Sequence, residues 1–538
     1  MLNTKTYCFI LFAAGSLLQA RPVRAAEGLN GNLVSVGWLE KNLHHADVVI
    51  LDASSAQTYA AKHIPGAVSV DLFAWYGLKE LPPAEMERMY QSWGVSQGKQ
   101  IVIYDQGGTF LATRLFYSLY YYGFPARDLL ILDGGLFTWQ EAGLPVTKDV
   151  ASAATPGSFT VTSIRDEVRV KLPEFLTASG DKANNVLVDA LGADWHFGQV
   201  VPFNRGGHVP NSLSMPSADF FNPDKTFKSP EDIRRMLAYL GITSEQQIYT
   251  YCGGGVAASA PFFALKFLVN YPKVKLYSES ELGWLSDDRE LPYWTYDAPF
   301  LMRDTRWLQF FGGQMLRTYG GAAVSIVDLR SADGFKQGHV PLALNIPADA
   351  FKSNVTNPDK LAGILGSAGV DASHEAVIVS GSGLTKEAAL AFLLLEKLGQ
   401  KKVSVFMDSM DTWRQLGFAV TTDVVVAKAT AYTPNVRTQV IIADPNNTPG
   451  PYPTVFIASG KDVPAEGRDR TVVHVPYTDL MYSDGTPKAA KDLWGILTRA
   501  GVPRYAELVC FSDDPGEAAV NYFLLKLMGY ADVKVSVK

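Results

Sequence analysis

The segment IYTYCGGGVAA, residues 248–258, decides the fold, because a short apolar run leads directly into a cysteine and three glycines. An apolar run of this length that ends at a glycine-rich turn is typical of a buried strand. The residues that follow, up to about position 269, are apolar enough to form a helix packed on the same sheet. This order predicts an α/β unit in which Cys252 stands between a strand and a helix.

The same pattern occurs four times along the chain. Apolar strands at 101–104, 248–251, 376–379 and 508–511 each lead into a polar loop, an apolar helix and a further strand. A period near ~130 residues is the size of one compact domain and is too long for a solenoid repeat. The first loop residues, separated by 147, 128 and 132 positions, are Asp105, Cys252, Ser380 and Ser512.

Two further landmarks hold the same register in the first three copies. A His-x-Pro turn follows a short strand that ends in aspartate, and a tryptophan follows the loop by 32 to 34 positions. In the fourth copy, His474-Val475-Pro476 matches the prolines that end the next strand instead, so this copy is degenerate. The landmarks are Asp52, Asp189 and Asp328; His63, His208 and His339; and Trp139, Trp284 and Trp413.

Alternating strands and helices predict mainly parallel sheets with helices on both faces. We therefore expect four tandem domains, joined by linkers near residues 147–157, 295–303 and 421–434. The predicted domains span residues 28–148, 158–297, 304–423 and 435–538.

The N-terminal 25 residues have the composition of a secretory signal. Lys5 precedes an almost wholly apolar run from position 7 to position 18, and Val23-Arg24-Ala25 resembles a cleavage site. The expected product is an exported protein, periplasmic or secreted.

The formal net charge of the whole chain is −6, and loss of a basic signal makes the mature chain more acidic. Such a surface does not favour nucleic acid or anionic membranes. No later segment is long and apolar enough for a membrane helix.

These motifs resemble the rhodanese family of thiosulfate and 3-mercaptopyruvate sulfurtransferases. The resemblance is strong over the second domain, good over the first and third, and weak over the fourth. It implies four rhodanese-like domains, each with a mainly parallel five-stranded sheet, of which only the second keeps the catalytic cysteine. It also implies sulfur transfer from thiosulfate or 3-mercaptopyruvate to a thiol or cyanide through a Cys252 persulfide, without a cofactor or a metal.

The chemistry expected at Cys252 follows from its loop. Glycines allow backbone N–H groups to converge, and a helix N-terminus adds partial positive charge. Both features favour a thiolate, so we expect a lowered pKa and a nucleophilic sulfur. The loop residues predicted to hold the persulfide or substrate anion are Gly253, Gly254, Gly255, Val256 and Ala257.

Four other residue positions bear on the kind of reaction. A cysteine-dependent phosphatase needs an arginine on its loop, and this chain has Ala258 six residues after the cysteine. Arg205 stands where tandem relatives place a substrate-binding arginine, and a solvated loop charge is the alternative. His208 is more readily interpreted as a residue that fixes its turn than as a general base. The uncharged loop is closer to the mercaptopyruvate type, although Ala257-Ala258 replaces the usual Thr-Ala.

The other three domains cannot perform the same reaction, because Asp105, Ser380 and Ser512 replace the cysteine. An aspartate in this loop should repel anionic donors. Cys510, which lies in an apolar strand, is expected to be a core residue. The second hypothesis is therefore a non-catalytic binding or scaffold protein, in which the domains without a cysteine dock a protein partner.

Overall fold

The structure is a computed structural model, and it describes most of the chain. The predicted signal peptide lies outside the described residues, so the structure does not test it. Among the described residues, no helix is long and apolar enough to cross a membrane. The described residues are 31–74, 80–149, 155–313, 316, 318, 323–423, 428–442, 450–464 and 472–537.

Four five-stranded sheets follow one another along the chain, and their strands pair in parallel. The predicted α/β fold of tandem domains is therefore confirmed. In every sheet the strand that leads into the loop is central. In spatial order, the sheets are β1 (Leu33–Val34), β5 (Leu129–Leu132), β4 (Gln100–Tyr104), β2 (Val48–Asp52) and β3 (Val68–Ser69); β6 (Arg169–Val170), β10 (Val274–Tyr277), β9 (Gln247–Tyr251), β7 (Asn185–Asp189) and β8 (Ser212–Ser214); β11 (Met302–Arg303), β15 (Lys402–Phe406), β14 (Glu375–Val379), β12 (Val324–Asp328) and β13 (Leu344–Asn345); and β16 (Ile441–Ile442), β20 (Val533–Ser536), β19 (Glu507–Phe511), β17 (Thr454–Ala458) and β18 (Val472–His474).

Helices flank each sheet, as expected for parallel strands that need crossover connections. The first domain has α1 (Val36–Asn42), α2 (Ala56–Ala61), α3 (Pro83–Ser92), α4 (Leu111–Tyr121) and α5 (Gly135–Glu141). The second has α6 (Leu172–Ser179), α7 (Ala193–His196), α8 (Pro230–Tyr239), α9 (Ser259–Phe263) and α10 (Ser280–Leu285). The third has α11 (Thr305–Phe311), α13 (Ala332–Lys336), α14 (Ala348–Lys352), α15 (Pro358–Ser367), α16 (Lys386–Lys397) and α17 (Met410–Gln415), and the fourth has α18 (Ala490–Ala500) and α19 (Pro515–Leu527).

The strand register brings the sequence landmarks together at one edge of each sheet. Asp189, which ends β7, pairs with Tyr251, the residue before Cys252. Asp52 pairs with Tyr104 in the first domain in the same way. Because the carboxyl ends of parallel strands share one edge, the aspartate and the loop meet where α/β sheets place their ligand sites.

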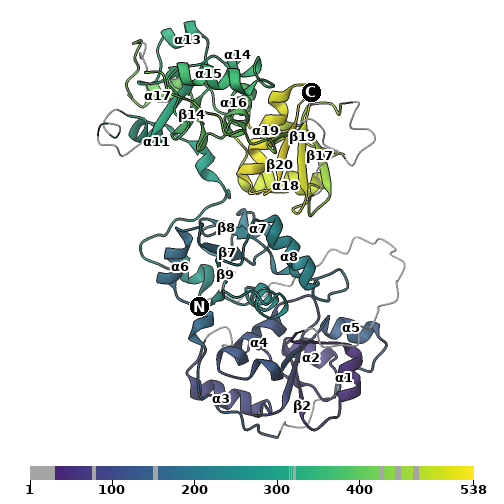
Figure 1. Ribbon diagram of the computed structural model, residues 1–538. Coiled ribbons are helices and arrows are strands. Elements are labelled where there is room, and N and C mark those ends of the chain that lie inside the picture. The colour runs from purple at the N-terminus through teal and green to yellow at the C-terminus, as the bar shows by residue number, and fades with distance from the viewer. Residues whose placement is uncertain are drawn as a thin grey trace.

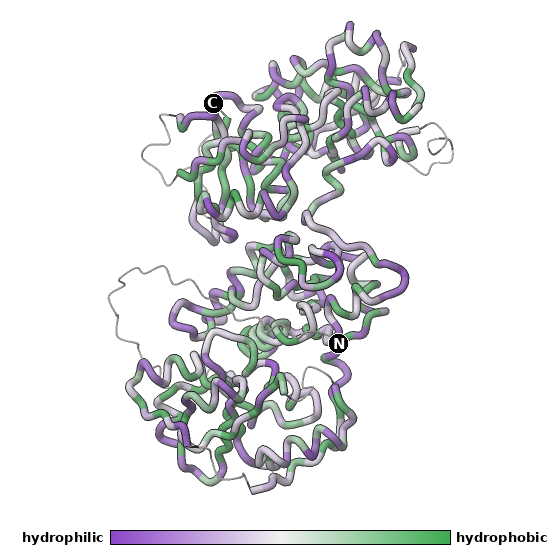
Figure 2. The backbone as a smooth tube through the Cα atoms, turned by 180° about the vertical axis from the view of Figure 1, so that it is seen from behind, coloured by the Kyte–Doolittle hydropathy of each residue, from purple (hydrophilic) through white to green (hydrophobic). Residues whose placement is uncertain are grey.

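The domains pack in two pairs, seen as two lobes in Figure 1. In the lower lobe α4 lies against α9, and the rings of Phe116 and Phe263 meet edge to face at 4.9 Å between centroids. In the upper lobe α16 lies against α19, where Phe392 and Phe523 make the same kind of contact at 4.9 Å. Each pair thus shares one continuous apolar core. Hydrophobic residues run through the strands and the helices between paired domains in Figure 2.

The two lobes touch through the second and fourth domains. The Tyr239 hydroxyl donates a hydrogen bond to the Ala506 carbonyl at 2.9 Å. The rings of Phe197 and Trp494 stack with centroids 5.6 Å apart. The linker that joins the lobes also contacts the fourth domain, since the Ala298 N–H donates to the Leu527 carbonyl at 3.1 Å.

The landmark tryptophans hold each domain together behind its loop. Trp284 is buried, packs edge to face on Phe175, and donates its indole N–H to the Pro292 carbonyl at 2.9 Å. We expect Trp284→Ala to destabilise the second domain by about 3–5 kcal/mol, as large-to-small core substitutions do. Hydrogen exchange of β9 and β10 amides measures this loss. Unchanged protection in these strands would show that the tryptophan contributes little.

Candidate active site

Cys252 lies directly after β9, and its side chain is buried. The Gly255 N–H donates a hydrogen bond to its sulfur at 3.1 Å. The loop therefore folds around the sulfur, and a backbone N–H group donates to the atom that carries the negative charge of a thiolate. This contact is the feature of the site that matches the expected cradle most directly.

Gly255 is the glycine on which the loop depends. Its φ is +81°, a region that residues with a side chain rarely adopt. A Cβ at this position would lie 2.4 Å from the Ser278 carbonyl oxygen. Gly253 and Gly254 have no such φ, and a Cβ on either would meet only the ends of side chains, at 3.3 Å. The three glycines therefore have different roles, and Gly255 is indispensable for the turn.

The start of α10 fixes the loop from the other side. The Cys252 N–H donates to the Ser280 hydroxyl at 3.0 Å, and that hydroxyl donates to the Tyr277 carbonyl at 2.7 Å. The N–H groups of Glu281 and Leu282 donate to the carbonyls of Cys252 and Gly253, each at 3.0 Å. These contacts hold the loop in one conformation before any substrate arrives.

The expected lowering of the cysteine pKa is wrong for this structure. Burial raises the pKa of the Cys252 thiol above its ordinary value, and the N–H groups of Ala258, Gly254 and Gly255 oppose this only in part. The physical reason is that removing a thiolate from water costs more than these donors return. The resting cysteine is therefore mainly a thiol at neutral pH, although a thiolate of high pKa is the stronger nucleophile once formed.

The reactivity of Cys252 should accordingly keep rising in alkaline solution. Only the thiolate is alkylated, so we expect the rate of iodoacetamide labelling to increase about tenfold per pH unit between pH 7 and pH 9. Intact mass at timed intervals measures the rate, with the Cys252→Ser variant as the control for labelling elsewhere. A rate that levels off below pH 8 would contradict a raised pKa.

The helix after the loop begins later than the sequence pattern predicts. The α-helix starts at Ser259 and is continued by a π-helix over Ala264–Leu268. Val256 and Ala257 belong to a turn, in which the Ser259 N–H donates to the Val256 carbonyl at 3.1 Å. This late start explains Pro261, which falls in the first helical turn where no N–H is needed.

The first domain contributes to the wall of the loop. The Arg114 guanidinium donates to the Gly255 carbonyl at 3.4 Å. The hydroxyl groups of Thr113 and Ser259 lie 2.8 Å apart across the domain boundary. Glu80 accepts a hydrogen bond from the Ser278 hydroxyl at 2.6 Å, just behind Gly255. The pair of domains therefore builds the site jointly.

The mouth of the loop is apolar. Leu282, whose side chain is about half exposed, borders Gly254, and the ring of Phe203 borders Gly253. Arg205 is held by its surroundings: its guanidinium donates to the Leu291 carbonyl at 3.0 Å and lies 5.6 Å from the centroid of the Tyr293 ring. A role for Arg205 in substrate binding stays a prediction.

The loops of the other domains are filled by their own side chains. The Asp105 carboxylate accepts hydrogen bonds from the N–H groups of Gly107, Leu111 and Ala112 at 2.8, 3.1 and 3.0 Å, so it occupies the anion cradle itself. The Ser380 hydroxyl donates to the Gly383 carbonyl at 2.7 Å. The Ser512 hydroxyl donates to Glu517 at 2.6 Å. Asp105 therefore stabilises its own loop. The sequence analysis predicted only that this aspartate repels anionic sulfur donors.

Cys510 lies in the core of the fourth domain, as predicted. It is buried in β19 and is not part of a disulfide, and neither is Cys252. Burial raises the pKa of the Cys510 thiol far above its ordinary value. Cys510 is therefore unreactive in the folded chain.

A buried network of acids and histidines beside the loop escaped the sequence analysis. His196 lies between two carboxylates, with Nδ1 at 2.7 Å from Asp189 and Nε2 at 2.6 Å from Asp297. Burial lowers the pKa of His196, but Asp297 and Asp189 outweigh burial and bring it to about 9. Burial and the neighbouring His196 lower the pKa of His208 to about 4. Burial and Asp189 raise the pKa of Glu281, whose N–H holds the Cys252 carbonyl, to about 9.

The landmark histidines fix their turns, as interpreted from the sequence. His63 Nδ1 contacts the Tyr59 carbonyl at 2.8 Å, and His339 Nδ1 contacts the Phe335 carbonyl at 2.9 Å. His208 Nδ1 contacts the His196 carbonyl in the same way at 2.8 Å. The histidine does this in domains with and without a cysteine, so its role in the turn does not depend on chemistry at the loop.

Relatives with similar sequences carry names from sulfur metabolism. The chain is 29% identical over 267 residues to the sulfur carrier protein TtuD of Thermus thermophilus, an alignment of 47% of this chain and 93% of that protein. It is 31% identical over 281 residues to a probable 3-mercaptopyruvate sulfurtransferase of Pseudomonas aeruginosa, covering 48% of this chain and 97% of the relative. Each of these relatives thus matches about half of this chain.

A similar solved structure is that of the 3-mercaptopyruvate sulfotransferase SseA from Escherichia coli, with a TM-score of 0.42 and 26% identity over 46% of this chain and 98% of that one. A sequence model of the Rhodanese-like domain matches residues 35–142, 172–287 and 314–416. These three segments make up more than half of the chain, and each contains the last four strands, in chain order, of one of the first three sheets. The chain therefore belongs to the rhodanese-like domain family.

Proposed function

We propose that the chain is a sulfurtransferase that carries sulfur as a persulfide on Cys252. The observation that carries the proposal is the hydrogen bond from the Gly255 N–H to the cysteine sulfur, in a loop held rigid by α10. The sulfurtransferase names of similar proteins support the same class of reaction. Thiosulfate or 3-mercaptopyruvate is the proposed donor, and a small thiol or cyanide is the proposed acceptor.

The first half-reaction loads the sulfur. After loss of its proton, the Cys252 thiolate attacks the outer sulfur of thiosulfate; an S–S bond forms to the cysteine, and the S–S bond of the donor breaks to release sulfite. With 3-mercaptopyruvate, the C–S bond breaks instead, and the carbon takes up a proton to give pyruvate. The Gly255 N–H then faces the sulfur chain, where it stabilises negative charge.

The second half-reaction transfers the outer persulfide sulfur from Cys252 to the acceptor. An acceptor thiolate attacks the outer persulfide sulfur, a new S–S bond forms on the acceptor, and Cys252 leaves as a thiolate. The apolar mouth around Phe203 and Leu282 suits an acceptor that presents its sulfur beside an uncharged surface. No metal or organic cofactor takes part in either step.

Steady-state kinetics test this scheme. A matrix of donor and acceptor concentrations, with thiosulfate or 3-mercaptopyruvate against cyanide, should give parallel double-reciprocal lines, because the donor product leaves before the acceptor binds. Lines that intersect would show that both substrates bind together and would overturn the covalent intermediate.

The second candidate is a non-catalytic scaffold, favoured by the loops of three domains whose own side chains fill them, as Asp105 does. This candidate predicts no turnover with either donor and an unmodified Cys252 after incubation. Turnover that disappears with Cys252→Ser excludes it for the second domain. The three other domains can then serve to complete the lobes and to dock a protein partner.

A further inference from the structure

Three donor atoms of different side chains converge beside the linker between the lobes. They are Nε2 of His196, Nε2 of His208 and a carboxylate oxygen of Asp297, and they all lie within 4.8 Å of one another. Asp297 Oδ1 is 2.6 Å from His196 Nε2 and 3.3 Å from His208 Nε2. Two imidazoles and one carboxylate make up a ligand set that proteins use for Zn²⁺.

The other ring nitrogens fix how these imidazoles are presented. His208 Nδ1 faces the His196 carbonyl at 2.8 Å, and a carbonyl only accepts, so this nitrogen carries the hydrogen. His196 Nδ1 faces the Asp189 carboxylate at 2.7 Å, which also only accepts, so this nitrogen carries a hydrogen too. Both Nε2 atoms therefore point at Asp297. A carboxylate or a carbonyl behind each imidazole is the support that metal-binding histidines usually have.

Nε2 of His208 has no hydrogen-bond partner within the described residues. His208 Nε2 is buried and forms no hydrogen bond, although a carboxylate oxygen lies 3.3 Å away. A lone pair that faces a carboxylate in a buried place is unfavourable. A cation bound between the nitrogen and the oxygen would convert this repulsion into two ligand bonds.

The repeats show that the fold does not need these groups. His63 stacks on Tyr59 and His339 stacks on Phe335, with centroids 3.7 and 3.5 Å apart, where His208 stacks on His196 at 3.6 Å. Beyond the ring, His63 Nε2 and His339 Nε2 face backbone carbonyls, at 3.1 and 3.2 Å. The second domain replaces an aromatic ring by a histidine and a backbone carbonyl by the carboxylate of Asp297. Both replacements put a metal ligand where the fold requires only packing.

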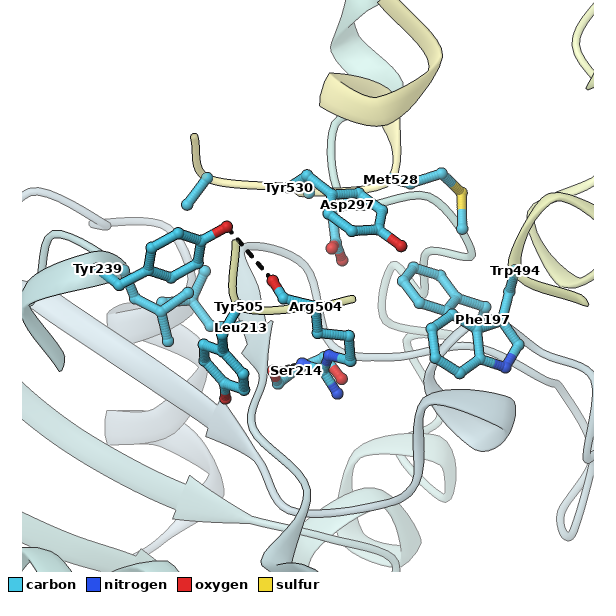
Figure 3. Close-up of a pocket in the computed structure, with 13 residues that line it drawn as sticks. Phe197, Leu213, Ser214, Tyr239, Asp297, Trp494, Arg504, Tyr505, Met528 and Tyr530 are labelled. Atoms are coloured by element: carbon cyan, nitrogen blue, oxygen red, sulfur yellow. Dashed lines mark hydrogen bonds between the residues drawn. The ribbon is translucent and has the colours of Figure 1, made fainter. Parts of the chain in front are cut away.

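Asp297 also borders a small cavity between the second and fourth domains (Figure 3). The cavity has a volume of about 40 Å³, enough for a water molecule. The Ser214 and Tyr530 hydroxyls belong to its lining and have no hydrogen-bond partner within the described residues. A water in this cavity could complete four-coordinate binding beside three protein ligands.

We propose that His196, His208 and Asp297 bind one Zn²⁺ ion. Ligand atoms around one tetrahedral Zn²⁺ lie about 3.4 Å apart, and the ion lies near the plane of each imidazole that binds it. The two stacked rings, which are parallel to within 4°, must therefore turn out of parallel when the ion binds. The ion takes the place of the hydrogen between His196 and Asp297, which is released to solvent. It ties the linker residue Asp297 to the second domain, and it does not depend on chemistry at Cys252.

Zinc titration of the full chain tests the proposal. After treatment with EDTA and its removal, titration with zinc chloride against a chromophoric chelator should show one Zn²⁺ per chain. His196→Phe imitates Phe335 of the third domain, so it keeps the stacked ring and removes a ligand; Asp297→Asn is the second variant. Each should weaken binding about 100-fold, with circular dichroism as the check of folding. The partly exposed His374 of the third domain, changed to alanine, is the control and should leave binding unchanged.

Cys252 is itself a zinc ligand in principle, so the titration is repeated with Cys252→Ser. We expect the same stoichiometry, and X-ray absorption at the zinc edge should show nitrogen and oxygen neighbours without sulfur. Failure to bind Zn²⁺ at millimolar concentration would overturn the proposal. So would binding that survives in both His196→Phe and Asp297→Asn, or that is lost with Cys252→Ser.

Discussion

Cys252→Ser should abolish sulfur transfer, lowering kcat by about a thousandfold or more. A serine oxygen cannot carry a persulfide, and the loops of the other domains offer only Asp105, Ser380 and Ser512. Cyanide-dependent thiocyanate formation with thiosulfate or 3-mercaptopyruvate measures the loss.

Cys510→Ala is the matched control for Cys252. This residue lies within strand β19 in the core of the fourth domain, and the variant should keep its turnover. Comparable activity in Cys252→Ser and the unaltered chain would remove the cysteine from the mechanism. Loss of activity with Cys510→Ala alone would point to a second thiol in the reaction.

Gly255→Ala should reduce turnover by about 100-fold or more, because the loop cannot keep its shape. An alanine at a φ of +81° is strained, and its Cβ would lie 2.4 Å from the backbone carbonyl of Ser278, which cannot move as a side chain does. The displaced loop would withdraw the N–H that contacts the cysteine sulfur. The decrease should appear in kcat with each donor.

Gly254→Ala separates this effect from a general sensitivity of the loop. The φ of Gly254 is not positive, and the added Cβ would meet the end of the Leu282 side chain at 3.3 Å, which can shift. This variant should retain most of the activity. Equal losses in the two variants would indicate that added bulk, and not the backbone conformation at Gly255, causes the defect.

The repeated landmarks were sufficient to predict the four parallel sheets and the position of Cys252. A strand before the loop, a strand that ends in Asp189 and a tryptophan behind them each fix one part of the same topology. Their register leaves little freedom, since Asp189 pairs with Tyr251 as Asp52 pairs with Tyr104. Local patterns suffice here because each domain closes its own sheet.

The electrostatics of the loop could not be predicted in the same way. The sequence shows the glycines that bring N–H groups toward the sulfur, but it does not show how deeply the sulfur is buried. In the structure burial outweighs those donors, so the pKa of Cys252 rises. The late start of α9 has the same origin, because the residues from Gly253 to Ala258 fold around the sulfur before a helix can begin.

The histidine network was hidden by an insertion. The aromatic residue that supports the landmark histidine lies four positions before it in Tyr59 and Phe335, but twelve positions before it in His196. Asp297 is a further 101 positions from His196, at the end of the domain. Only the folded chain brings these side chains together.

The most direct test of the central claim is the intact mass of the protein after incubation with a sulfur donor and removal of small molecules. We predict a gain of one sulfur atom with thiosulfate or 3-mercaptopyruvate, lost on addition of cyanide and absent in Cys252→Ser. No gain with either donor, or a gain that persists in Cys252→Ser, would contradict a persulfide on this cysteine.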